Sequence, residues 1–260
     1  MGACLLLNAG MDPKGKVALI TGGARIGQAV AEFLARAGCS VALTYKSSRG
    51  AALATVRRAE SLGVRGTALR ADLGRPAAIK SVIEKVVRTF DRLDILVNMA
   101  SHYEQTPLED LGRPQRRSDA FEKNIAVDLR SAYELSLLAA PHMEKAGAGR
   151  IINFVDWVVA SGRPRYRGYI PYYTAKAGVK GLTEILALEL APAILVNAIA
   201  PGPILAPAGL SRSVNKEVLA NTPLKRWGGP EEIAKTVLFL VQSNFVTGET
   251  LRVDGGRHLN

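Results

Sequence analysis

The sequence is poor in cysteine and has no long apolar run. Only Cys4 and Cys39 occur among 260 residues, so we expect no disulfide framework and favour a reducing compartment such as the cytoplasm. The longest apolar stretches, such as residues 194–200, are far shorter than the ~20 residues that a membrane-spanning helix needs. We therefore expect a cytoplasmic protein that does not associate with membranes.

Acidic residues are also scarce. The 23 Asp and Glu stand against 34 Lys and Arg, which gives a formal net charge of +11. Such a balance occurs in proteins that bind nucleic acid, membrane surfaces or anionic small molecules. The basic residues are scattered, and no basic stripe is interleaved with aromatic residues, so nucleic acid is the least supported partner. The charge favours an anionic small molecule such as a dinucleotide, or simply solvated Arg-rich faces.

Short apolar runs alternate with helical patterns along the chain. Residues 16–21 read as a buried strand, and apolar residues from Val30 to Ala37 then recur at the spacing of one helical face. This alternation predicts a single doubly wound Rossmann-type α/β domain, in which helices cover both faces of a seven-stranded parallel sheet. Further strands are predicted at 41–45, 66–71, 93–98, 150–155, 194–199 and 249–253, and further helices from about 50, after 76, and over 119–146, 172–190 and 230–241.

The N-terminal residues carry no folding pattern. Residues 1–10 have neither the basic start nor the apolar length of a signal peptide. We expect residues 1–13 to form a disordered extension and residues 14–260 to form the domain. Residues 201–213 are expected to be a loop inside that domain.

A glycine-rich turn lies between the first predicted strand and the first predicted helix. Residues 21–27 read Thr-Gly-Gly-Ala-Arg-Ile-Gly. Glycine permits close backbone approach there, and a helix N-terminus favours a pyrophosphate. We predict that Gly22, Arg25, Ile26 and Gly27 bind a dinucleotide; an ordinary turn is the alternative.

No acidic residue occurs between Glu32 and Glu60. An NAD site usually places one at the end of the second strand, where it binds the ribose hydroxyls. Here that strand ends at Tyr45, Lys46 and Ser47. A cation with hydroxyls suits a 2′-phosphate, which a carboxylate would repel. We therefore predict NADP(H) rather than NAD(H), against the alternative of an exposed basic turn without a ligand.

Tyr172 and Lys176 are placed one turn apart near the start of a predicted helix, so their side chains share one face. An ammonium beside a phenol stabilises the phenolate and brings the group toward an acid/base range. Asp156 follows the strand at 150–155, at the edge where such sheets bind ligands. We predict a catalytic group of these three residues; a surface Tyr–Lys pair and an Asp that caps a turn are the alternatives.

Together these motifs resemble the short-chain dehydrogenase/reductase family over about residues 14–258. Asn98 after the fourth strand, Pro201-Gly202 after the sixth and the ending at 246–256 add to the likeness. The resemblance implies hydride transfer from a nicotinamide cofactor, with Tyr172 as proton donor and Lys176 also holding the nicotinamide ribose, and it suggests a homotetramer. The further cofactor-binding residues that it implies are Asp72, Leu73, Asn98, Ala100, Ser101, Pro201, Gly202 and Ile204.

Asp156 stands where most members of that family carry Ser. This form is similar to pteridine reductases and to dihydrofolate and dihydromonapterin reductases, in which the residue at Tyr103 would stack on a pterin. The expected function is NADPH-dependent reduction of a pterin C=N bond. Alternatively, Tyr103 shields the cofactor, and Trp157 is either a pocket wall or core. The expected substrate-binding residues are Ser101, Tyr103, Asp156, Trp157 and Tyr172.

Some features depart from the family pattern. The glycine-rich turn is shorter than usual, and Asp128 stands where the family usually has an Asn that anchors a water of the proton relay. The loop at 161–167 is longer than usual, and its Arg residues either bind an anionic substrate tail or are solvated. The alternative functions are a carbonyl reductase of the 3-oxoacyl type and, in another class, a non-catalytic NADP-binding regulator. No metal site is expected.

Overall fold

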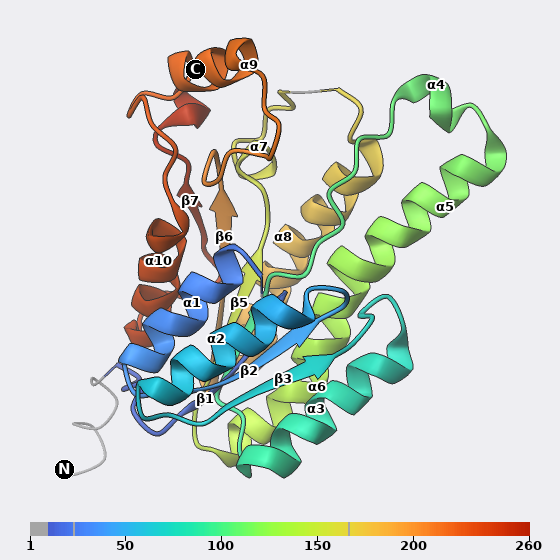
Figure 1. Ribbon diagram of the computed structural model, residues 1–260. Coiled ribbons are helices and arrows are strands. Elements are labelled where there is room, and N and C mark those ends of the chain that lie inside the picture. The colour runs from blue at the N-terminus through green and yellow to red at the C-terminus, as the bar shows by residue number, and fades with distance from the viewer. Residues whose placement is uncertain (1–9, 23, 166) are drawn as a thin grey trace.

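The computed structural model describes residues 10–22, 24–165 and 167–260, which form a doubly wound α/β fold (Figure 1). One sheet holds seven strands, all paired in parallel, in the order β3-β2-β1-β4-β5-β6-β7. This confirms the predicted Rossmann-type sheet. The strands are β1 (Val17–Thr21), β2 (Ser40–Tyr45), β3 (Gly66–Arg70), β4 (Ile95–Asn98), β5 (Gly149–Phe154), β6 (Ile194–Pro201) and β7 (Thr250–Val253).

Helices cover both faces of the sheet (Figure 1). Successive strand residues point to opposite faces, so Ile20 of β1 packs in one core cluster and its neighbour Leu19 in the other. The first cluster packs under α1 (Ile26–Arg36), α2 (Arg49–Ser61) and α10 (Pro230–Gln242). The second packs under α3 (Pro76–Phe90), α6 (Ser131–Lys145) and α8 (Ile170–Leu190). Both strand faces are buried, which explains the continuous apolar runs.

The helix predicted over 119–146 differs from the observed one. The helical segment begins earlier, as α5 (Pro114–Asn124), continues through a π-helical stretch, η2 (Ile125–Arg130), and ends as α6. The π-helical stretch carries Asp128. The hydrophobic periodicity of the sequence did not reveal the π-helical stretch, because apolar residues keep their helical spacing on both sides of one wider turn.

Short helices were missed by the sequence reading. They are α4 (Leu108–Leu111), α7 (Trp157–Ala160), α9 (Arg212–Ala220) and the final turn η3 (Arg257–Leu259). The start of α9 lies inside the predicted 201–213 loop, where the Ser211 hydroxyl accepts a hydrogen bond from Val214 N at 3.3 Å. Most of these elements are too short for an apolar period to develop.

The packed domain begins before residue 14. Met11 is 7% exposed and belongs to the core cluster on the α1 side, and a Cβ at Gly10 would lie 1.7 Å from Gln242 O at the end of α10. Residues 10–13 therefore differ from the expected disordered extension. Residues 1–9 lie outside the described residues. None of the helices in the described part of the chain is long and apolar enough to cross a membrane.

Candidate active site

A cleft of about 610 Å³ lies at the carboxyl ends of the strands. It is lined from both sides of the point where the strand order reverses, between β1 and β4, where open α/β sheets bind their ligands. Most residues predicted for the site line this cleft. They are Gly22, Arg25, Ile26, Tyr45, Lys46, Ser47, Asp72, Leu73, Ala100, Ser101, Tyr103, Asp156, Tyr172, Pro201, Gly202 and Ile204.

The glycine-rich turn has the form of an anion cradle. Gly22 has φ 83°, and a Cβ at Gly27 would lie 2.2 Å from Gly22 O, so this approach requires glycine. The helix α1 that follows has no side-chain cap, so no side chain occupies its N-terminus, where the helix dipole favours a phosphate. Arg25 adopts φ 55° and ψ −108° in the same turn, a conformation that costs about 1–3 kcal/mol for a residue other than glycine. Gly23 lies outside the described residues.

Lys46 lies at the mouth of the cleft. Its ammonium is 2.9 Å from Asp72 Oδ2, with side-chain exposures of 68% and 32%. The hydrogen bond from Lys46 holds the pKa of Asp72 below its usual value. A 2′-phosphate bound here would compete with Asp72 for this ammonium. The residues of the cleft thus fit a phosphorylated dinucleotide at both the turn and the mouth.

The structure brings Tyr172, Asp156 and Lys176 together. The Tyr172 hydroxyl donates to Asp156 Oδ2 at 3.1 Å, and the Lys176 ammonium lies 5.8 Å from the centre of the Tyr172 ring. All three residues are buried. Asp156 Oδ1 also accepts a hydrogen bond from Val158 N at 2.8 Å, so Asp156 caps α7 while it contacts the phenol. A proton donor and an acceptor therefore face each other in the cleft wall.

Asp128 belongs to the same group. Its Oδ1 lies 3.2 Å from Lys176 Nζ and accepts a hydrogen bond from the Ser101 hydroxyl, and its Oδ2 accepts from His102 N at 3.0 Å. Lys176 donates in turn to Phe154 O at 2.8 Å. Lys176 therefore lies behind the cleft wall, held by two acceptors.

Aromatic rings border the open side of the cleft. Tyr103, 57% exposed, stacks on Tyr169 with ring centres 4.8 Å apart and meets the Tyr172 ring edge-on at 4.9 Å. Tyr169 was missed by the sequence reading, although an aromatic residue just before the catalytic helix was a visible signal. A smaller cavity of about 230 Å³ beside these rings shares Asp156 and Tyr172 with the cleft and reaches Arg167. The smaller cavity therefore offers space for a substrate beside the Tyr172 side chain.

Trp157 and Asn98 lie away from the cleft surface. Trp157 is 7% exposed, lies under the Arg257 guanidinium at 5.4 Å, and lines neither cavity, so the structure places it in the core. Asn98 is buried beneath the cleft, where its amide donates to Asn153 Oδ1 at 2.9 Å, and Asn153 donates to Thr183 at 3.0 Å. Neither side chain lines the cleft, and the predicted contacts of Trp157 with substrate and of Asn98 with cofactor stay predictions.

The Arg residues of the 161–167 loop separate in space. Arg167 lines the smaller cavity, whereas Arg165 donates to His258 O at 3.3 Å near the C-terminus. Residue 166 lies outside the described residues.

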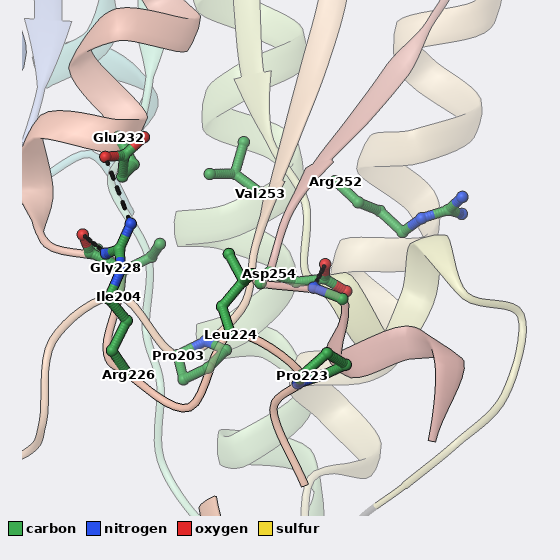
Figure 2. Close-up of a pocket in the computed structure, with 12 residues that line it drawn as sticks. Pro203, Ile204, Pro223, Leu224, Arg226, Gly228, Glu232, Arg252, Val253 and Asp254 are labelled. Atoms are coloured by element: carbon green, nitrogen blue, oxygen red, sulfur yellow. Dashed lines mark hydrogen bonds and ion pairs between the residues drawn. The ribbon is translucent and has the colours of Figure 1, made fainter. Parts of the chain in front are cut away.

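A further hollow of about 350 Å³ lies on the other side of Ile204 (Figure 2). Ile204 lines both this hollow and the cleft, and Arg226 is paired with Glu232 at 3.8 Å within it. Its wall contains none of the three predicted catalytic residues. The acid/base chemistry therefore belongs to the cleft.

Comparison with known proteins agrees with this arrangement. A family model described as enoyl-(acyl carrier protein) reductase matches residues 23–258. A short-chain dehydrogenase/reductase from Serratia marcescens is 32% identical with a TM-score of 0.86, and the match covers 95% of this chain and 100% of that one. The chain belongs to the short-chain dehydrogenase/reductase family.

Other known proteins match this chain over nearly their full length. The 3-oxoacyl-(acyl-carrier-protein) reductase FabG of Staphylococcus epidermidis is 36% identical over 250 residues, which are 94% of this chain and 99% of that protein. A blue fluorescent protein from a metagenomic library, solved in complex with NADPH, is 32% identical with a TM-score of 0.84; 95% of this chain and 99% of that chain are covered. These comparisons show that the protein is an oxidoreductase of the short-chain class.

Proposed function

We propose that the protein is an NADPH-dependent carbonyl reductase that acts on a ketone of the 3-oxoacyl type. The observation that carries the proposal is the Tyr172 hydroxyl, which is buried against Asp156 and Lys176 in the wall of the 610 Å³ cleft. The name of the staphylococcal relative and the NADPH complex of the metagenomic protein support it. These comparisons favour the carbonyl alternative over the pterin prediction.

Each of the three predicted catalytic residues has its own role in this reaction. The bound nicotinamide supplies the hydride that reduces the carbonyl carbon. Tyr172 donates its proton to the carbonyl oxygen as negative charge develops there, and the nearby Lys176 ammonium stabilises the phenolate that remains. Asp156 accepts the Tyr172 hydrogen bond while its other oxygen is held by Val158 N, which fixes the hydroxyl before the substrate arrives.

Reduction of a pterin C=N bond is the second candidate. The Asp156 carboxylate beside Tyr172, where most of the family carries Ser, and the exposed ring of Tyr103 favour it. A carboxylate accepts hydrogen bonds from the nitrogens of a pterin edge, and an aromatic ring covers its face. The stack of Tyr103 on Tyr169 would have to open for a pterin to enter between the rings.

One assay separates the candidates. NADPH oxidation is followed with acetoacetyl thioesters and, separately, with dihydrobiopterin, dihydrofolate and dihydromonapterin. We expect turnover of the thioester, and Tyr172→Phe lowers kcat by 100-fold or more, on the order of a lost general acid. Tyr133→Phe, which removes a hydroxyl from the exposed Tyr133 of α6, is the matched control and keeps full activity. Turnover of a pterin alone would reject the carbonyl proposal; NADPH binding without any turnover would favour a regulator.

We also propose a cytoplasmic homotetramer. Apolar side chains project from α6 and α8 into solvent: Leu137 is 42%, Ile185 49% and Leu188 75% exposed. Such a surface suits contact with a second copy of the chain. Light scattering coupled to gel filtration gives the mass, and a monomer at micromolar concentration would reject the assembly.

A further inference from the structure

Asp128 joins segments of the site that are distant in sequence. Its two oxygens contact the Ser101 hydroxyl, His102 N, the Asn124 amide at 3.4 Å and the Lys176 ammonium at 3.2 Å. The side chains of Asp128 and Lys176 are 0% and 3% exposed. Charges are rarely buried this deeply unless each has an opposite charge and hydrogen bonds to replace water. Asp128 has both.

The charge of Asp128 acts on the phenol through Lys176. The other acceptor described for the Lys176 ammonium, Phe154 O at 2.8 Å, carries no formal charge, so Asp128 supplies a compensating one. The ring centre of Tyr172 lies 5.8 Å from the same ammonium. A cation stabilises phenolate, and a carboxylate paired with the cation weakens that effect. The ionisation of Tyr172 therefore depends on both charges.

The hydrogen bonds of Asp128 act on the substrate side. Ser101 and His102 immediately precede Tyr103, whose ring stacks on Tyr169 at the open edge of the cleft. A second hydrogen bond holds the same segment, because the Asn124 amide donates to His102 O at 2.6 Å. The position of the Tyr103 ring thus follows from the contacts of Asp128.

We propose that Asp128 is a positioning residue with two separable effects. Its charge compensates Lys176 and so sets the pH at which Tyr172 ionises, and its hydrogen bonds fix the 101–103 segment that forms the substrate side of the cleft. The proposal rests on the proposed function only in taking Tyr172 as the proton donor.

Other ionisable groups from the packed elements surround this region. They are present in every Asp128 variant compared below, so the difference between variants reports the change at Asp128. They are Tyr103, His102 and Glu104 after β4, Arg116 and Lys123 on α5, Asp156 after β5, Arg167 and Tyr169 before α8, and Lys176 on α8.

The charge effect is tested without any substrate. Tyrosinate absorbance is titrated in the wild type and in Tyr172→Phe, and the difference reports Tyr172; the same pair is then measured with Asp128→Asn added. We expect the midpoint of Tyr172 ionisation to fall by about one pH unit once the carboxylate is neutral. Glu104→Gln is the matched control, because it removes a carboxylate of the same segment that pairs with Arg116; the midpoint stays in place.

The hydrogen-bond effect is tested with Ser101→Ala, which keeps the Asp128–Lys176 pair. We expect KM for the ketone to rise several-fold in Ser101→Ala and also in Asp128→Ser, which keeps the Ser101 hydroxyl, while the Tyr172 midpoint changes little in Ser101→Ala. An unmoved midpoint in Asp128→Asn overturns the charge effect, and an unchanged KM in Ser101→Ala overturns the positioning effect. Should Asp128→Asn not fold, Asp128→Ser, which leaves room for a water beside Lys176, gives the same titration. A wild type that reduces no ketone defeats the proposed function, yet the titration still tests Asp128.

Discussion

Replacing Lys46 tests the cofactor proposal directly. A charge-assisted hydrogen bond from an ammonium to a phosphate contributes about 1.5–3 kcal/mol. Lys46 is 68% exposed and paired with Asp72 at 2.9 Å, so solvent screening and the lost pair reduce this to about 1.4 kcal/mol, a factor of about ten. We expect Lys46→Met to lower kcat/KM for NADPH about tenfold and to leave kcat/KM for NADH nearly unchanged.

The assay compares initial rates with the two cofactors at several salt concentrations. The tenfold difference should shrink at high salt, because ions screen an exposed charge. Asp72→Asn is the informative partner variant: it removes the carboxylate that competes for Lys46 and should raise the ratio of kcat/KM for NADPH over NADH a few-fold, because any lost contact with the adenine affects both cofactors alike. The reasoning is refuted by a wild type that prefers NADH, or by a Lys46→Met enzyme that loses both activities equally.

Further predictions concern the scaffold of the site. Gly202→Ala places a Cβ 2.5 Å from Asp254 Cβ, so it should cost about 1–3 kcal/mol and weaken NADPH binding; thermal melts with and without NADPH measure both, and an unchanged Tm contradicts the clash. Arg150→Met removes the donor to Val241 O, Gly149 O and Ser243 O and should lower the free energy of unfolding by about 2–4 kcal/mol in urea. Burial raises the pKa of Cys39 to about 12, so peptide mapping should find it unalkylated at pH 8 until the protein unfolds; rapid labelling of the native protein would contradict this.

The fold followed from local patterns in the sequence. Continuous apolar runs such as residues 16–21 predicted buried strands, and the observed β1 (Val17–Thr21) differs by one residue at its start. The helical spacing of Tyr172 and Lys176 predicted a shared face, and the structure has both buried side by side. These features depend on residues close in sequence, which is why periodicity reveals them.

The contacts of the site depend on packing between distant segments. Asp128 reaches Lys176 because a π-helical stretch packs against α8, and no spacing in the sequence marks that contact. The same holds for Trp157, whose side chain turns into the core beneath Arg257. Sequence reasoning named the residues that follow strands but not the direction in which each side chain points.

The buried amides beneath the cleft form a row in which every donor points the same way. Asn98 donates to Asn153, Asn153 to Thr183, and Thr183 to Val179 O of the catalytic helix α8. No member of such a row can turn around alone, since two donors or two acceptors would then face each other without water to separate them. A displacement of α8 would therefore break the row at Thr183, and so the cofactor-side strands and the helix that carries Tyr172 are expected to move as one rigid unit.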